Sequence, residues 1–265
     1  MAQGTDVTVA ALSTSIPVRL SRNCSVRVTL TYYPPAASLP RHAHAYDALS
    51  FLLCGSLCER NGSYDCELLH PGIGFKPAGC DHENRWGPYG ALVFSIAFAD
   101  GMADGALPAL SSGWRALRDW AMLPALIGAC LMEDGETSRI EAVTDIVGLA
   151  NGEDGRARGA APLWLMRARA DLFEAPGEVT VAGAAQAAGV HRVHFSRMFR
   201  RHFGIAPSVF RRHCMTAAAM RSLLREKQPL AVAAQRAGFA DQSHMSRAVK
   251  AVTGCPAGRL QVGLT

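Results

Sequence analysis

The last third of the chain contains one short pattern twice, and this duplication constrains the fold more than any other feature. The first copy runs from Ala185-Gln186-Ala187-Ala188-Gly189-Val190 to Phe195-Ser196-Arg197-Met198-Phe199-Arg200-Arg201. The second runs from Ala234-Gln235-Arg236-Ala237-Gly238-Phe239 to Met245-Ser246-Arg247-Ala248-Val249-Lys250. Each copy predicts a helix of small residues, a turn at glycine, and a second helix with basic residues on its polar side. This is the pattern of a helix-turn-helix unit, whose second helix enters the major groove of DNA.

The charge of the chain is divided unequally between its two parts. Residues 162–265 contain 15 Lys and Arg against 5 Asp and Glu, a net charge of +10, whereas residues 1–161 contain 12 against 17, a net charge of −5. This division indicates that only the C-terminal part meets a polyanion. The alternative is a helical bundle whose arginines form a solvated surface. The duplication, the matching glycines and the charge together favour DNA binding.

The pattern along the chain predicts an α+β protein. Residues 1–105 suggest a β-sandwich or small barrel, with strands at Val26–Tyr33, Leu49–Leu57 and Ala91–Phe98 and a hairpin turn at Asn61-Gly62. Residues 106–150 have apolar residues at helical spacing, interrupted by Pro124. We expect these helices to pack on the β-domain or on a second subunit and to form a coupling and dimerisation segment. Residues 151–161 have the composition of a linker, which leaves 162–265 as the DNA-binding domain.

The two repeats, at about 179–202 and 229–253, each predict a set of outward-facing residues. In the first, Thr180 is expected to cap the supporting helix, Gly189 to form the turn, and a recognition helix to follow at about 191–202. In the second, Asp241 is expected to cap the recognition helix. The residues predicted to contact DNA are Arg192, Val193, Ser196, Arg197, Arg200 and Arg201 in the first repeat and Gln242, Ser243, Ser246, Arg247 and Lys250 in the second.

The segment between the repeats predicts one spacer helix, from about Pro207 to Glu226. About 20 residues at 1.5 Å rise span ~30 Å, and one turn of DNA is ~34 Å long. A rigid helix of this length is consistent with two recognition helices in successive major grooves.

Residues 162–261 resemble the AraC/XylS type of bacterial transcription regulator. The resemblance rests on the two repeats above, and most specifically on Gly238-Phe239-x-Asp241-x-Ser243-His244. It implies a seven-helix double helix-turn-helix domain that binds double-stranded DNA and usually recruits RNA polymerase. The chain departs from the family at Val249, where Phe is usual, and at Cys255-Pro256-Ala257-Gly258-Arg259-Leu260, which replaces Thr-Pro-x-x-Tyr-Arg. These departures imply looser packing around the second repeat.

The N-terminal part resembles the cupin motifs in His42-Ala43-His44, Asp47 and Pro77-Ala78-Gly79-Cys80-Asp81-His82. The resemblance implies a cupin-like β-barrel, which AraC-type regulators often use as a sensor domain. In metal-binding cupins such residues converge on one ion, so His42, His44, Asp47 and His82 are candidate ligands for a divalent Zn, Mn, Fe or Ni ion. The alternative is that the histidines line a pocket or serve the structure. On one strand, His-x-His would place both imidazoles on the same face.

The remaining features set the expected environment and activity. No apolar run approaches the ~20 residues that cross a bilayer, and Met1–Leu20 lacks the features of a signal peptide, so we expect a cytoplasmic protein without membrane contact. Among the eight cysteines, Cys54 and Cys58 would share a face of a regular strand, and a thiol or heavy-metal sensor is the alternative to buried structural roles. The sequence predicts a non-enzymatic, homodimeric regulator that binds a small-molecule or metal effector. The alternative is a metal-dependent cupin enzyme fused to a DNA-binding module.

Overall fold

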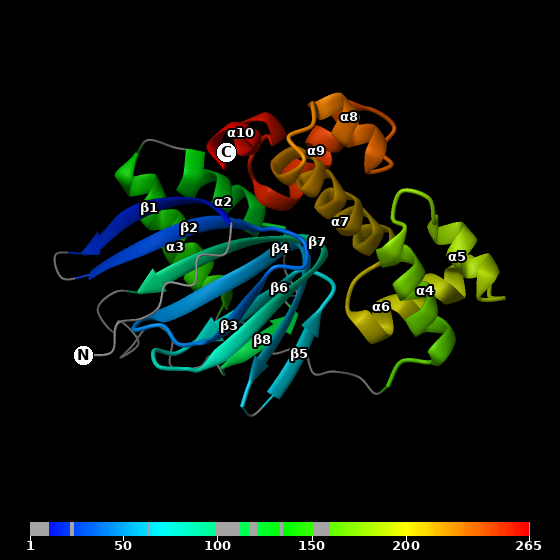
Figure 1. Cartoon of the computed structure of the whole chain (residues 1–265), viewed down its shortest axis with the longest axis horizontal. Helices are drawn as coiled ribbons and strands as arrows, with labels where there is room; N and C mark the ends of the chain where they lie inside the picture. The colour runs from blue at the N-terminus through cyan, green and yellow to red at the C-terminus, as the bar shows by residue number, and fades with distance from the viewer. Residues whose placement is uncertain are drawn as a thin grey trace.

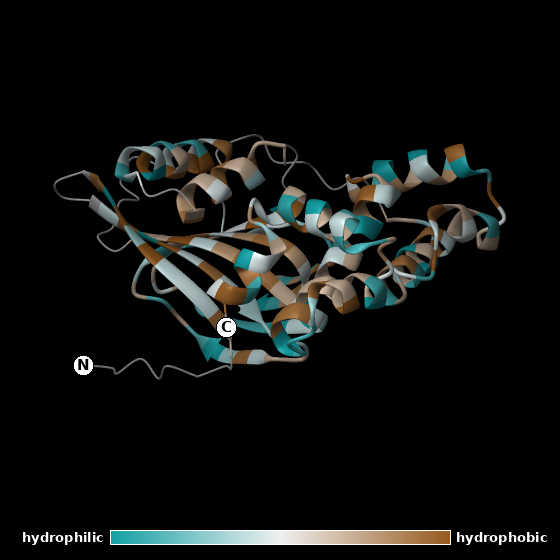
Figure 2. Ribbon diagram, turned by 90° about the horizontal axis from the view of Figure 1, so that it is seen from above, coloured by the Kyte–Doolittle hydropathy of each residue, from teal (hydrophilic) through white to brown (hydrophobic). Residues whose placement is uncertain are grey.

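The computed structural model of the chain describes residues 11–21, 24–62, 64–98, 112–116, 121–132, 135–150 and 160–264. Figure 1 shows an antiparallel sheet built by the N-terminal half, with the helices of the C-terminal part against it and beside it. Seen from above, the molecule is elongated, and the helices that contain the first repeat lie at one end of it, beside the sheet (Figures 1 and 2). The predicted α+β class, a sheet-rich N-terminal part followed by a helical C-terminal part, is confirmed.

Eight strands form one antiparallel sheet within the described residues. They are β1 (Leu12–Ser21), β2 (Cys24–Tyr33), β3 (Ser38–His42), β4 (Asp47–Asn61), β5 (Tyr64–Leu68), β6 (Gly72–Lys76), β7 (His82–Phe98) and β8 (Gly113–Ala116). The three strands predicted from the sequence lie within β2, β4 and β7, and β2 ends immediately before Pro34-Pro35.

Strands β4 and β7 pair with each other and change their second partner part-way along. The first part of β4 pairs with β6 and its last part with β5, while β7 changes from β3 to β2. Near this change, Gly55 and Gly90 have φ of +91° and +71°, and a Cβ on Gly55 would lie 2.0 Å from the Gly90 carbonyl oxygen. Only residues without a side chain fit such a close backbone contact. The two strands therefore bend together, and the sheet folds around an interior.

The two faces of the sheet have different surroundings because side chains alternate along each strand. On β2, Leu30 and Tyr32 point to the outer face, whereas Thr29 and Thr31 line the interior. The outer face packs against α2 (Leu123–Met132), α3 (Glu136–Ala150) and α7 (Pro207–Met220) in the largest apolar core. That core also contains residues of the second repeat, such as Met245. The second repeat is thus part of the same packed body as the sheet.

The C-terminal part contains seven α-helices within residues 160–264, the number that the family resemblance implies. They are α4 (Leu163–Glu174), α5 (Val181–Ala187), α6 (Arg192–Phe203), α7, α8 (Leu230–Arg236), α9 (Gln242–Thr253) and α10 (Ala257–Gly263). A π-helical segment, η1 (Arg221–Arg225), continues α7. A second apolar core, which includes Phe195, Phe199 and Phe210, joins α4 to α7 around the first repeat.

Residues 106–150 are not helical throughout. Gly113–Ala116 forms strand β8, which pairs with β6, so the expectation of helix from the beginning of this segment is wrong there. A strand of four residues is too short to show a period in the sequence, and it is fixed by its pairing partner. Pro124 does not interrupt a helix, because α2 begins at Leu123 and proline is tolerated in a first turn. Helices α2 and α3 pack on the β-domain, which was one of the two predicted arrangements.

Two local predictions in β4 are also corrected. The hairpin β4–β5 exists, but Asn61 is still paired with Tyr64, so its turn begins at Gly62 rather than at Asn61. Strand β4 is irregular between Leu52 and Cys54 and again between Gly55 and Leu57, and this removes the regularity that would place Cys54 and Cys58 on one face. Cys54 is buried and Cys58 is half-buried.

Most of the predicted linker, residues 151–159, lies outside the described residues. Among the helices that are described, none has the length and hydropathy required to cross a membrane.

Candidate nucleic-acid interface and histidine cluster

The first helix-turn-helix unit is formed by α5 and α6. Thr180 Oγ1 accepts a hydrogen bond from Gly183 N at 3.0 Å, which confirms the predicted N-cap of α5. Gly189 turns the chain with φ +66°, as predicted, and α6 ends at Gly204 with φ +74°. A glycine with positive φ therefore lies on each side of the recognition helix α6.

The second unit, formed by α8 and α9, repeats this geometry. Gly238 turns the chain with φ +80°, and Asp241 Oδ1 accepts a hydrogen bond from His244 N at 2.6 Å, which confirms the predicted cap. Helix α9 has 12 residues, as α6 has, and ends at Gly254 with φ +75°. The second unit has one more residue between glycine and recognition helix, so the two helices match position by position from Arg192 and Gln242 onward.

Each recognition helix buries an apolar side and leaves a basic side exposed. Phe195 and Phe199 of α6 and the equivalent Met245 and Val249 of α9 are fully buried. Met198 is only half-buried. Val249, where the family usually has Phe, is fully buried in the main apolar core.

Helix α7 joins the two units and is held at both of its ends. Arg211 Nε donates to the Val179 carbonyl at 2.8 Å, which fixes the segment before α5. At the other end, the Glu226 carboxylate pairs with Arg221 at 3.1 Å and with Arg236 at 2.7 Å. The spacer helix predicted from about Pro207 to Glu226 is confirmed, except that its last turn is π-helical.

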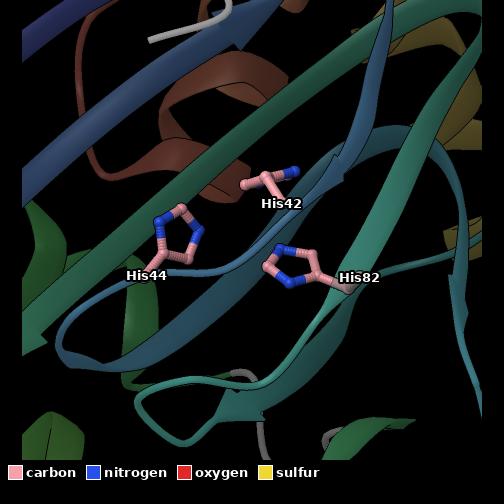
Figure 3. A group of neighbouring side chains, drawn as sticks. All are labelled: His42, His44 and His82. Atoms are coloured by element: carbon pink, nitrogen blue, oxygen red, sulfur yellow. The ribbon is translucent and has the colours of Figure 1, made fainter. Parts of the chain in front are cut away.

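Three histidines of the N-terminal domain converge (Figure 3). The nitrogen ligand atoms of His42, His44 and His82 all lie within 4.8 Å of one another, and His82 is buried. His42 is the last residue of β3 and His44 follows the strand, so alternation along one strand, which we used to predict the pair, is not the reason for their proximity. The bend of the chain after His42 brings the two rings to 5.0 Å between centroids.

Hydrogen bonds orient two of the histidine side chains, and burial favours the neutral form of His44 and His82. His42 Nδ1 donates to the Pro40 carbonyl at 2.7 Å and His82 Nδ1 to the Cys80 carbonyl at 3.0 Å, so the Nε2 lone pair of each remains available. Burial lowers the pKa of His44 to about 4, and burial also lowers the pKa of His82. Neutral imidazole is the form that ligates a divalent ion.

Asp47 lies outside this cluster. Its Oδ1 atom accepts a hydrogen bond from Ala78 N at 2.8 Å and fixes the loop before His82. Glu59 is a buried carboxylate whose Oε2 atom lies 2.8 Å from Lys76 Nζ and accepts a hydrogen bond from Asn84 Nδ2 at 2.7 Å. The pKa of Glu59, which burial alone would raise, is held below its ordinary value by Lys76. No motif or spacing in the sequence indicates this pair.

The histidine cluster borders a cavity of about 180 Å³ inside the sheet. Its wall includes the three histidines, and aromatic side chains line it as well, namely Tyr33, Tyr46, Trp86 and Trp114. Trp86 stacks on Tyr33 with ring centroids 3.9 Å apart, and its buried indole N–H has no hydrogen-bond acceptor among the described residues. The interior therefore combines planar aromatic walls with the indole N–H of Trp86 and the nitrogen lone pairs of the histidines.

Comparison with known families supports the reading of the two repeats. Residues 184–261 match a family model described as a helix-turn-helix domain. This segment begins within α5 and ends within α10, and it contains both recognition helices. Residues 184–261 form an AraC-type helix-turn-helix DNA-binding domain.

Solved structures similar to the chain fall into two groups. The C-terminal domain of AraT, a response regulator from Geobacillus stearothermophilus, is 23% identical over 39% of this chain and 88% of its own, with a TM-score of 0.37. The DNA-binding domain of AdpA, solved with a target DNA, is 22% identical over 37% of this chain and 89% of its own, with a TM-score of 0.35. A cupin superfamily protein from Desulfitobacterium hafniense is 17% identical over 38% of this chain and 84% of its own, with a TM-score of 0.29. A comparison with curated protein sequences finds no match.

The residues of the AraC-type domain that we predicted to contact DNA lie on the two recognition helices, and most of them are exposed. Ser196 and Ser246 are half-buried. The exposed ones are Arg192, Val193, Arg197, Arg200, Arg201, Gln242, Ser243, Arg247 and Lys250. Within the described residues, none of these basic side chains forms an ion pair. Arg211, Arg221 and Arg236 of the same domain, in contrast, are used in internal contacts.

Two structural residues of this domain were missed from the sequence. His191 caps α6, because its Nδ1 atom accepts a hydrogen bond from Val193 N at 3.3 Å. Its position immediately before Arg192, which matches that of Asp241 before Gln242, is the signal that could have revealed it. Arg211 donates a hydrogen bond to the Val179 carbonyl, and nothing in the sequence indicates this contact.

Proposed function

We propose that this chain is a cytoplasmic transcription regulator whose two recognition helices read adjacent major grooves and whose N-terminal domain senses an effector. The observation that carries the proposal is the pair of matched helices, α6 and α9, each with an exposed basic side free of internal ion pairs. Their common spacer, α7, is fixed at both ends by Arg211 and by Glu226. A rigid spacer is required if the two helices are to keep one helical repeat of DNA between them.

Selection of duplexes from a random pool by the full chain tests this proposal. We expect two conserved motifs about 10–10.5 base pairs apart, centre to centre. Arg197→Ala should weaken base preference in one motif and Arg247→Ala in the other, each by ~1–3 kcal/mol of discrimination. Arg225→Ala, on the π-helical segment, is the control for removing a basic residue outside the recognition helices. Unchanged preferences in both recognition-helix variants would overturn the assignment of Arg197 and Arg247 to base contacts and, with it, the predicted orientation of the two helices in the grooves.

The interior of the sheet is the proposed effector site. The cavity lies between the histidine cluster and the aromatic wall, and Trp86 offers an N–H without an acceptor. A small molecule with a planar apolar part and an acceptor group would satisfy both features. Strand β4 connects this site to the DNA-binding domain, because Ala48 and Ser50 line the cavity while Phe51 belongs to the core shared with α7. An effector would shift the population of DNA-competent arrangements.

A divalent metal is the second kind of effector that the cluster would accept. His42, His44 and His82 would supply three nitrogen ligands, and Asp47 would join them only by giving up its hydrogen bond to Ala78 N. Titration of the full chain with Zn²⁺, Mn²⁺, Fe²⁺ and Ni²⁺ tests this site. We expect stoichiometric binding that His82→Ala abolishes and Asp47→Asn leaves intact. Binding that survives His82→Ala would exclude the cluster as the site.

The histidine cluster also keeps an enzymatic function as a second candidate. A metal-dependent cupin enzyme fused to the DNA-binding module would hold Fe or Mn at the same three histidines. Metal analysis together with DNA-binding measurements separates the candidates. A sensor changes its affinity for the selected duplex when metal or ligand binds, whereas an enzyme turns over its ligand without such a change.

The domain organisation and partners are proposed on the same basis. We assign residues 1–105 to the sensor domain, 106–150 to a coupling and dimerisation segment, 151–161 to a linker and 162–265 to DNA binding, except that strand β8 (Gly113–Ala116), which pairs with β6 and brings Trp114 to the cavity, belongs to the sensor domain. Besides double-stranded DNA, the partners would be RNA polymerase and a second copy of the chain. Sedimentation of the full chain at several concentrations tests the homodimer, and a monomer at all of them would overturn it.

A further inference from the structure

Val193 is an exposed apolar residue on a surface that is otherwise polar. It has 56% of its surface exposed, and among the described residues it is the one large apolar side chain exposed on either recognition helix. A β-branched residue is also a poor choice for an exposed helix position, because its rotamers are restricted there. Neither packing nor helix propensity therefore explains why valine occupies this position.

The position of Val193 in α6 is one that reaches base edges. The helix begins at Arg192 and is capped by His191, so Val193 is its second residue, and the first residues of a recognition helix are the ones that contact bases. Arg197 follows four residues later and lies on the same side of the helix. Both side chains are exposed.

The second recognition helix offers a matched comparison. Ser243 of α9 occupies the position of Val193, and Arg247 occupies that of Arg197. The two helices thus share the arginine and differ in the residue one turn before it. Guanine is the base that arginine contacts with two hydrogen bonds, whereas apolar side chains in the major groove contact the 5-methyl group of thymine.

From this comparison we infer that Val193 reads a thymine methyl group next to the guanine read by Arg197, and that the half-site bound by α9 has no such requirement. The inference rests on the proposed function, because it specifies the DNA that the two helices bind. It makes the two half-sites different in kind: one is selected by a methyl group and a guanine, the other by hydrogen bonds from Gln242, Ser243 and Arg247.

Single replacements of thymine by deoxyuridine in the selected duplex test the inference, because deoxyuridine lacks only the 5-methyl group. The half-site of α6 is first identified by the Arg197→Ala variant. One thymine in it should respond, with a dissociation constant that rises roughly fourfold, the factor expected from losing one buried methyl group. Val193→Ala should bind the thymine and deoxyuridine duplexes equally, which is the signature of a direct contact in a double-mutant cycle.

Two further variants serve as controls. Val193→Ser installs the residue of the second helix and should also abolish the response. Val262→Ala removes a valine that is 79% exposed on α10 and should leave the response unchanged. Because Val193 is exposed, its variants should keep the circular dichroism spectrum and unfolding midpoint of the parent chain.

The outcomes separate this inference from the proposed function. Sequence-selective binding in which no thymine of the α6 half-site responds, or in which the response persists in Val193→Ala, overturns the inference alone. Absence of any sequence-selective binding by the full chain overturns the proposed function and the inference with it.

Discussion

His213 Nδ1 on helix α7 lies 3.3 Å from the carbonyl oxygen of Leu53 on strand β4 and donates a hydrogen bond to it. This contact joins the spacer of the DNA-binding domain to the strand that borders the cavity proposed as the effector site. Nearby, Tyr89 donates a hydrogen bond from its hydroxyl to the Glu174 carbonyl at 2.6 Å, and Arg221 lies over the Tyr89 ring. The sheet therefore contacts α7 and the end of α4, and an effector that moves β4 would act on the spacer directly.

The contact of His213 predicts loss of stability on acidification. Burial lowers the pKa of His213 to about 4, whereas an imidazole in the unfolded chain titrates near 6.5. Between these values the unfolded chain binds more protons, so the free energy of unfolding should fall as the pH falls from 6.5 to 4. His213→Asn retains a donor for the Leu53 carbonyl but does not titrate, and it should recover about 2 kcal/mol of the loss.

Denaturant unfolding of both proteins at pH 7.5, 5.5 and 4.5 measures this effect. The dependence of the unfolding free energy on pH should become weaker in the variant but should not disappear, because burial also lowers the pKa of His44, His70 and His82. Identical slopes in the two proteins would show that His213 is not the group responsible.

Arg200 and Arg201 should govern the salt dependence of DNA binding rather than its base preference. They are exposed in the last turns of α6, away from the end that reaches the bases, and they have no ion-pair partner among the described residues. Each phosphate contact removed should reduce the slope of log K against log salt by about 1 and weaken binding to all sequences alike. Affinity measured for Arg200→Gln and Arg201→Gln between 50 and 300 mM salt checks this, and a selective loss for one sequence would contradict it.

The buried pair of Glu59 and Lys76 should be far more sensitive to substitution than an exposed one. Glu59 is 1% exposed and Lys76 is 9% exposed. Glu59→Gln leaves the ammonium group buried without a counter-charge, which should cost about 3–5 kcal/mol of unfolding free energy. Asp65→Asn, which breaks the exposed pair with Arg60, is the control and should cost less than ~1 kcal/mol. Equal effects in the two variants would show that Lys76 reaches solvent.

The parts of this structure that could be predicted are those fixed by local sequence. Thr180 and Asp241 are residues whose side chains cap helices, and Gly189 and Gly238 are required where φ is positive, so the limits of both repeats follow from the chain itself. The strands β2, β4 and β7 follow in the same way from runs of β-branched and aromatic residues.

The parts that could not be predicted depend on contacts between distant segments. The Glu59–Lys76 ion pair forms because strand β6 pairs with strand β4, and no spacing in the sequence predicts that these two strands are neighbours. The convergence of the three histidines was predicted from motif resemblance, yet the reason given, alternation along a strand, fails because β3 ends at His42. The packing of the second repeat on the sheet could not be predicted either. Met245 belongs to the core that contains the sheet, but its spacing in the sequence indicates only that it is buried in a helical domain.

Gly204 and Gly254, the two glycines that end the recognition helices, should respond differently to the same substitution. Their backbone conformations match, with φ of +74° and +75°. A Cβ on Gly204 would meet nothing within 4 Å, whereas a Cβ on Gly254 would lie 1.8 Å from the Pro124 carbonyl oxygen of α2. Gly204→Ala should therefore cost only the strain of the left-handed conformation, about 1–2 kcal/mol. Gly254→Ala adds a backbone clash that can be relieved only by moving α2 away from α9, so we expect a loss of unfolding free energy above ~3 kcal/mol.

Denaturant unfolding of the two variants measures the two losses, and the rate of hydrogen exchange in α2 should rise only in Gly254→Ala. Equal losses, with α2 equally protected in both variants, would mean that α2 does not pack against the end of the second recognition helix.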